Sequence, residues 1–136
     1  MAIPVITLLI TSCLIIIQLV LTAIVIRERR RSKVHIDSDG ASVLERAIRA
    51  HANFTEVTPI FLISLLILEL VDSYLWWVSI LGVAFILGRI LHATSLLSEA
   101  ALNETYPRRR LGMLLTLIPL AASAISSVVW VVWNLI

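Results

Sequence analysis

The sequence is short of the residues that hold soluble and secreted domains together. It has one cysteine, Cys13, so no disulfide can form within the chain, and only four glycines, which form no phosphate-binding loop. Charged residues make up 15% of its 136 residues, whereas a soluble domain has about a quarter. No spacing of cysteine and histidine typical of a zinc site is present, and we expect no metal. A disulfide scaffold, a P-loop enzyme and a zinc-binding module are therefore excluded.

Apolar residues make up most of what is present. They account for 60% of the chain, and the mean hydropathy is +1.00. Crossing a hydrocarbon core of roughly 30 Å takes about 20 helical residues. We expect four helices of at least that length, over residues 1–26, 45–71, 74–97 and 111–136. The sequence thus predicts a single domain over residues 1–136, an all-α membrane protein folded as an antiparallel bundle of four transmembrane helices.

Basic residues and tryptophans set the expected orientation. All eleven lysines and arginines lie near one end of the four helices, while the short loop expected between the second and third holds Glu69 and Asp72 and no basic residue. Cytoplasmic loops are enriched in lysine and arginine, so we expect both basic loops inside and both termini on the non-cytoplasmic side. The four tryptophans lie at the opposite end, as an aromatic belt should. Because the basic residues flank apolar segments, the net charge of +2 indicates membrane contact and no nucleic-acid partner.

Polar side chains share one face of the expected second helix. Arg46, Arg49, Asn53 and Glu56 follow one another at steps of three, four and three residues, which is the helical repeat. Beginning the helix at residue 45 places Arg49, Asn53 and Glu56 at or inside the membrane boundary. Counted along their helices at about 1.5 Å per residue, Glu56 and Arg89 reach the same depth. Since a lone charge in the membrane is costly, we predict an ion pair between them.

Two histidines lie near this group. His92 follows Arg89 by three residues and shares its helix face, whereas His51 lies on a different face of the second helix, where we expect it at headgroup level. Two interpretations of the group stay open. Either it holds the second and third helices together, or it forms a concave site for an anionic ligand at the membrane surface. The surplus of arginine over acid favours the ligand site.

One segment of eleven residues resembles a family motif. Residues 49–59, Arg-Ala-His-Ala-Asn-Phe-Thr-Glu-Val-Thr-Pro, resemble the second-helix motif Arg-Ala-x-x-Asn-x-x-Glu-x-x-Pro of the membrane-associated proteins in eicosanoid and glutathione metabolism, the MAPEG family. Helix count, loop lengths and orientation are similar as well. The resemblance implies an antiparallel four-helix bundle that assembles into a homotrimer. It also implies that glutathione binds between neighbouring subunits near the cytoplasmic face.

The resemblance assigns roles to particular residues. Those implied to bind glutathione are Arg29, Arg49, Asn53, Glu56, Arg89 and His92. Arg110, which opens the fourth helix, is implied to hold the thiolate, with Arg108 and Arg109 as alternatives in the same run. The family usually has a tyrosine about one turn after the position of His92, where this sequence has Leu96.

The function implied by this resemblance is that of a glutathione-dependent membrane transferase or peroxidase. Such an enzyme stabilises the glutathione thiolate for attack on a lipophilic small molecule that arrives from the membrane lipids, or on a lipid hydroperoxide. A bacterial inner membrane is the expected location. Two alternatives stay open. One is a small transporter in which an intramembrane Glu56 couples protons to export, and the other is a non-catalytic membrane scaffold, which the missing tyrosine keeps open.

Overall fold

The computed structural model describes residues 3–34, 36, 42–71, 73–98 and 102–135, with the side chains of all of these but 102–105. Its helices are α1 (Val5–Ser32), α2 (Ser42–Leu70), α3 (Leu75–Leu97) and α4 (Leu102–Leu135). Each is long and apolar enough to cross a membrane, in α4 from Tyr106 onward. The predicted all-α bundle of four transmembrane helices is confirmed, and α2 begins well before its uncharged run, as predicted.

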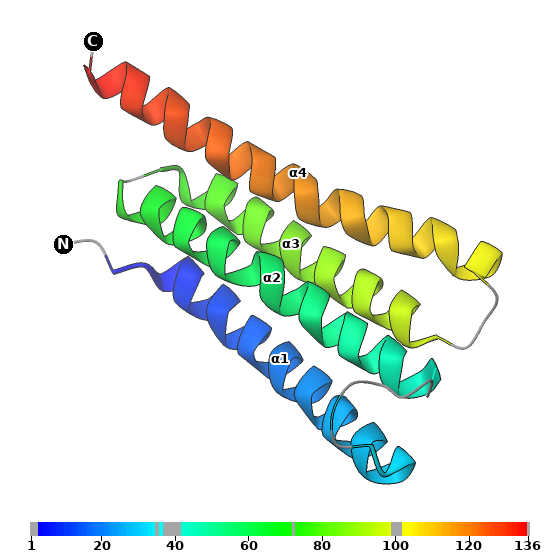
Figure 1. Cartoon of the computed structure of the whole chain (residues 1–136). Coiled ribbons are helices and arrows are strands. Elements are labelled where there is room, and N and C mark those ends of the chain that lie inside the picture. Colours follow the sequence, from blue (N-terminus) through cyan, green and yellow to red (C-terminus); the bar gives the residue numbers. More distant parts are fainter. Residues whose placement is uncertain (1–2, 35, 37–41, 72, 99–101, 136) are drawn as a thin grey trace.

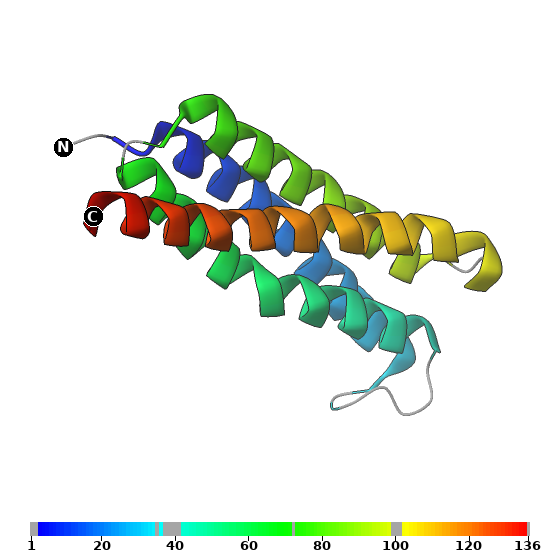
Figure 2. The same ribbon diagram turned by 90° about the horizontal axis from the view of Figure 1, so that it is seen from above.

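The helices lie side by side and alternate in direction, so that both ends of the chain are at the same end of the bundle (Figure 1). Helices α1 and α4 each pack against α2 and α3, and within the described part of the chain they do not contact each other. Figure 2, turned by 90°, shows the two termini at one end again. We call this the terminal end, and we call the opposite end, where the arginines of α1, α2 and α4 lie, the basic end.

The interior combines one aromatic stack with small hydroxyl residues. The rings of Phe61 and Phe85 stack with centroids 3.8 Å apart, and both side chains are fully buried. On α4, Ser123 is fully buried and accepts a hydrogen bond of 2.9 Å from the hydroxyl of Ser64. Small side chains that hydrogen-bond across helices allow membrane helices to approach closely. The aromatic stack thus joins α2 to α3, and the hydroxyl contact joins α4 to α2.

A carboxylate from α2 closes the first turn of α1. Glu69 is 4% exposed, and its two oxygens accept hydrogen bonds from the backbone N–H groups of Ile6 and Thr7, at 2.8 and 2.7 Å. The first N–H groups of a helix lack partners within the helix, and α1 has no acidic residue of its own in this turn. The sequence predicts a second helix over residues 45–71 and also counts Glu69 with the loop that follows. The helix range is the correct one, because α2 continues to Leu70 and carries the Glu69 carboxylate to α1. Asp72 lies outside the described residues.

Glycines bring α3 and α4 into backbone contact near the basic end. A Cβ added to Gly88 would lie 2.7 Å from the carbonyl carbon of Leu115, and one added to Gly112 would lie 2.7 Å from the backbone nitrogen of His92. Neither distance leaves room for a side chain unless the backbone moves. The crossing therefore fixes the place of Arg89 and His92, which follow Gly88 on α3.

Candidate functional site

Arg89 ties α3 to α2 in the interior of the bundle. Its side chain is 3% exposed, and its Nη1 donates to the backbone oxygen of Asn53 at 3.0 Å and to the Asn53 Oδ1 at 3.4 Å. Glu56 is exposed and makes no ion pair with Arg89 in the described part of the chain, so the predicted Glu56–Arg89 pair is wrong for the single subunit. Glu56 follows Asn53 by three residues, which leaves it about 60° further round the helix, and this offset places it on the exposed side of Asn53.

The remaining charges of the α2 motif lie on its outer surface. The Arg49 side chain is 70% exposed, and its Nη2 lies 3.0 Å from the Glu45 Oε1 on the same helix. Glu56 is exposed and makes no hydrogen bond or ion pair with another described residue. Exposed residues on this side form what we call the outer face of α2: Arg49, Glu56, Ile60, Ile63 and Ile67. Only Arg46 and Asn53 of the four predicted polar residues are partly buried.

His92 is buried beside Arg89, and its ring nitrogens are not well hydrogen-bonded. The residue is 3% exposed, and among the described residues neither Nδ1 nor Nε2 has a hydrogen-bond partner of normal geometry, although the ring lies near the backbone of Arg109. The Nε of Arg89 is buried and unpartnered in the same way. Leaving a buried polar atom unpaired costs about 1–3 kcal/mol. The structure therefore brings the predicted residues Asn53, Arg89 and His92 together, with donor and acceptor capacity that one subunit does not use.

The predicted start of the fourth helix at residue 111 is wrong, because α4 begins at Leu102, and the three arginines Arg108, Arg109 and Arg110 lie within it. They differ in direction. Arg109 is half-buried, whereas Arg108 and Arg110 are exposed. At about 100° per residue, Arg108 and Arg109 lie within about 60° of Gly112, the residue that contacts α3, and Arg110 lies about 160° away from it. In one subunit Arg110 thus faces away from His92. Its role as the thiolate arginine stays a prediction that depends on a neighbouring subunit, while Arg109 is the member of the run nearest the interior.

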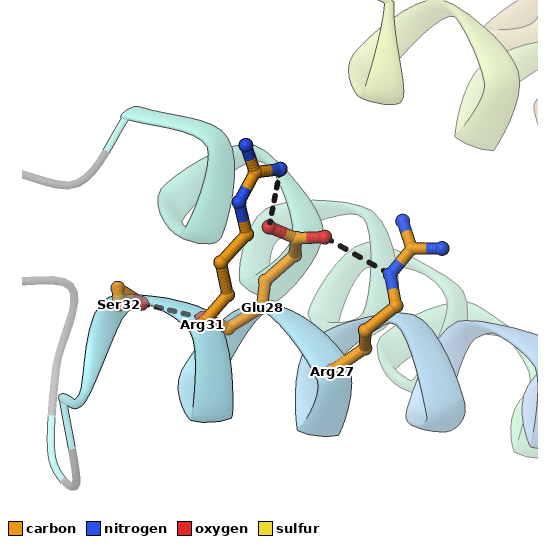
Figure 3. A network of polar contacts seen from close by, with 4 residues as sticks. All are labelled: Arg27, Glu28, Arg31 and Ser32. Atoms are coloured by element: carbon orange, nitrogen blue, oxygen red, sulfur yellow. Dashed lines mark hydrogen bonds and ion pairs between the residues drawn. The ribbon is translucent and has the colours of Figure 1, made fainter.

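The end of α1 is a run of arginines around one buried carboxylate (Figure 3). Glu28 is 5% exposed, its Oε1 accepts a hydrogen bond from Arg27 Nε at 3.1 Å, and its Oε2 lies 3.9 Å from Arg31 Nη1. The predicted glutathione contact Arg29 follows directly and is half-buried. Sequence reasoning missed Glu28, although a single acid inside a basic run was the available signal. By partly neutralising this run, Glu28 keeps the arginine side chains together at the basic end.

A second polar contact joins α1 to α2. The Nε2 of His51 lies 2.8 Å from the Gln18 Nε2 and 3.2 Å from the Thr22 hydroxyl. Beside it, a groove of about 230 Å³ runs between α1, from Thr11 to Gln18, and α2, from Phe54 to Leu62. Sequence analysis put His51 on a separate face but missed its partner, although Gln18 is the one amide in an uncharged run. His51 is a helix-to-helix contact and does not join Arg89 and His92.

Comparison with known proteins places these features in a family. The sequence profile of the MAPEG family matches residues 7–129, which is nearly the whole chain. Over 112 residues the chain is 29% identical to "Inner membrane protein YecN" of Escherichia coli (strain K12), and equally so to the protein of that name from Escherichia coli O6:H1. Each alignment covers 82% of this chain and 82% of the relative. No solved structure matches the chain. From the extent of the profile match and the four-helix membrane fold, the chain belongs to the MAPEG family.

Proposed function

We propose that the protein is a glutathione-dependent transferase or peroxidase of a bacterial inner membrane. The observation that carries the proposal is the pair of opposite charges on the outer face of α2. Arg49 and Glu56 are seven residues apart, which is about 10 Å along a helix, and an extended tripeptide has about the same length. Glutathione is a tripeptide with carboxylates at both ends and an ammonium at one. A guanidinium and a carboxylate at this separation match those end groups.

Asn53 lies between Arg49 and Glu56 along α2, and Arg89 holds it from the interior of the bundle. Its side-chain oxygen and backbone oxygen both accept from Arg89, so the amide cannot turn freely toward another partner. A ligand along the outer face of α2 would therefore meet one polar side chain in a fixed orientation. The buried guanidinium behind it also favours a ligand with net negative charge, because charges interact more strongly away from water.

A homotrimer explains why charges lie on a face that would otherwise meet lipid. Glu56 is 14 residues from Leu70 at the end of α2, or roughly 21 Å, which is within a hydrocarbon core of about 30 Å. Ionisable residues in membranes almost always face other helices or water-filled cavities. A neighbouring copy on the outer face of α2 would cover both charges and supply further cations. Its Arg29 and Arg110, at the same end of the bundle, are the residues we assign to that role.

The proposed chemistry needs a thiolate. A free thiol has a pKa near 8.5, so only a few per cent is ionised at neutral pH, and a guanidinium beside the sulfur favours the anion. The thiolate then attacks an electrophilic carbon and displaces a leaving group. With a lipid hydroperoxide it attacks the outer oxygen, the O–O bond breaks, and the lipid leaves as an alcohol. A second glutathione then converts the glutathione sulfenic acid to the disulfide and water. Since Leu96 has no hydroxyl, Arg110 carries the stabilisation.

Glutathione binding to the purified protein in detergent tests this proposal. Titration calorimetry should show saturable binding, and the ultraviolet absorbance of a thiolate should increase when glutathione is added at neutral pH. S-Methylglutathione, which has the same charged ends but no thiol, should bind without that absorbance. If glutathione binds without any thiolate signal, the protein is a binding module or scaffold, and the transferase assignment fails.

One observation favours the transporter as a second candidate. Glu56 has no cationic partner in the described part of the subunit, and an unpaired acid within the membrane is typical of proton-coupled transport. The two candidates differ in what Glu56 does. In a transporter, vesicles containing the protein should take up or release protons when a cargo is added, without glutathione. In the transferase, no proton flux accompanies substrate, and Glu56→Gln weakens glutathione binding.

A further inference from the structure

A second groove lies at the terminal end, far from the proposed glutathione site. It has a volume of about 480 Å³ and lies between the beginning of α3 and the end of α4. Four of its lining residues are aromatic, Tyr74, Trp77, Trp130 and Trp133. The Trp77 indole is held in place because its Nε1 donates to the Ser126 hydroxyl at 3.0 Å. The groove thus has aromatic walls, one of which is fixed by a hydrogen bond.

No basic residue of the described part of the chain lines this groove. In the sequence from residue 57 to 88 the only charged residues are Glu69 and Asp72, both acidic, and from residue 111 to the end there is none. Neither of these two segments contains a lysine or an arginine. The faces of tryptophan and tyrosine rings attract ammonium groups, most strongly for tryptophan. An aromatic groove in a region without basic residues suits a positively charged headgroup and does not suit an anion.

We propose that this groove binds the ammonium headgroup of a zwitterionic phospholipid in the leaflet at the terminal end. The lipid is the occupant that the surroundings supply, since interfacial tryptophans lie at headgroup level. Trp77 and Trp130 form the walls, and Trp133, which is 84% exposed, closes over the ammonium. An ordinary aromatic belt would contact all headgroups alike. A groove with aromatic walls selects the ammonium-bearing ones.

The test is lipid retention by the full-length protein. The protein is placed in nanodiscs of equal parts phosphatidylethanolamine and phosphatidylglycerol, and native mass spectrometry counts the lipids that stay bound. We expect wild type to keep phosphatidylethanolamine over phosphatidylglycerol by about two- to fivefold, the factor that one cation–π contact of about 0.5–1 kcal/mol provides. Trp133→Leu should abolish this preference, and Trp133→Phe should keep part of it.

Trp76 provides the matched control. It is the residue before Trp77, it is 61% exposed, and its ring contacts those of Tyr74 and Trp77, but it does not line the groove. Trp76→Leu should leave the preference unchanged. Equal retention of the two lipids by wild type overturns the proposal, as does an equal loss in Trp76→Leu and Trp133→Leu, which would indicate a general aromatic belt. Since Trp133 is exposed, its loss should not affect folding, and the helical circular dichroism of each variant checks this.

Discussion

Two acidic residues on the same apolar helix have opposite surroundings. Glu69 and Glu56 both lie on α2, 13 residues apart. Glu69 is buried, and each of its oxygens accepts a backbone hydrogen bond from α1. Glu56 is exposed and has no partner among the described residues. One acid is thus used by the fold, and the other is left for a ligand or a neighbouring subunit.

The arginines divide in the same way. Arg89 is buried and bonded to Asn53, whereas Arg49 is exposed and, among the described residues, pairs with the half-exposed Glu45 one turn away on its own helix, a pair worth about 0.3–0.5 kcal/mol. Burial and bonding thus identify the charges that stabilise the bundle. The exposed charges of the family motif, Arg49 and Glu56, are the ones we assign to glutathione. Substitution of a buried charge should therefore change the stability of the protein, and substitution of an exposed charge should change its affinity for glutathione.

The largest effect is expected from Glu69→Ala. Two N–H groups at the start of α1 would lose a charged acceptor, and hydrogen bonds to charged groups are each worth about 1.5–3 kcal/mol. We expect the free energy of unfolding in detergent to fall by about 3 kcal/mol or more. Glu69→Gln keeps one acceptor oxygen, so its free energy of unfolding should lie between those of wild type and Glu69→Ala. Equal stability of all three proteins would show that α1 does not depend on this cap.

Arg49→Ala should act on binding and leave the fold intact. Removing a charge-assisted partner of a carboxylate costs about 1.5–3 kcal/mol, or roughly ten- to a hundredfold in affinity for glutathione. The melting temperature and the oligomer size should not change. Glu45→Ala is the control, because it removes the partner of Arg49 without removing the arginine, and it should bind glutathione at least as well as wild type. A trimer that dissociates with unchanged affinity would make Arg49 structural.

Arg110→Ala should reduce the thiolate signal more than it reduces binding. A guanidinium that lowers the thiol pKa by one unit contributes about 1.4 kcal/mol, so we expect about tenfold less thiolate absorbance and conjugation rate. Arg108→Ala should change neither. Loss of the signal in Arg109→Ala instead would place the sulfur on the side of α4 that faces α3, in agreement with the half-burial of Arg109.

The smallest effect separates two possible partners of Arg89. A double-mutant cycle between Arg89→Gln and Asn53→Ala should show a coupling of about 0.6 kcal/mol in stability, which is typical of hydrogen bonds between membrane helices. The same cycle between Arg89→Gln and Glu56→Gln should be additive within about 0.3–0.5 kcal/mol. Coupling in the second cycle and none in the first would restore the ion pair that matched depth predicts and that the single subunit does not contain.

The fold could be predicted because it depends on the lengths of apolar runs. Four such runs, together with the extension of the second to include Arg49, Asn53 and Glu56, were sufficient for the four-helix bundle. Contacts between helices depend also on rotation about each helix axis and on the exact end of each helix. Depth along the axis does not determine either quantity. For this reason the partner of Arg89 was predicted wrongly, and the contact of Glu69 with α1 was not predicted.

The sequence motif proposes the residues of the candidate site but not their arrangement. The motif at residues 49–59 supplied Arg49, Asn53 and Glu56, and the structure adds that the first and last face outward while the middle one is held by Arg89. Which of three consecutive arginines faces a ligand depends on the helix that packs against α4 at Gly112, and this cannot be derived from the run itself.

The most direct test of the central claim compares glutathione affinity in Glu56→Gln and Glu69→Gln. Both substitutions replace one acid of α2 with the amide of the same shape. If the exposed charge binds glutathione and the buried one only supports the fold, titration calorimetry should give at least tenfold weaker binding for Glu56→Gln, with unchanged stability. The folded Glu69→Gln variant should bind glutathione with the affinity of wild type, but it should be less stable. Wild-type affinity in Glu56→Gln, or an equal loss in both variants, would contradict the account.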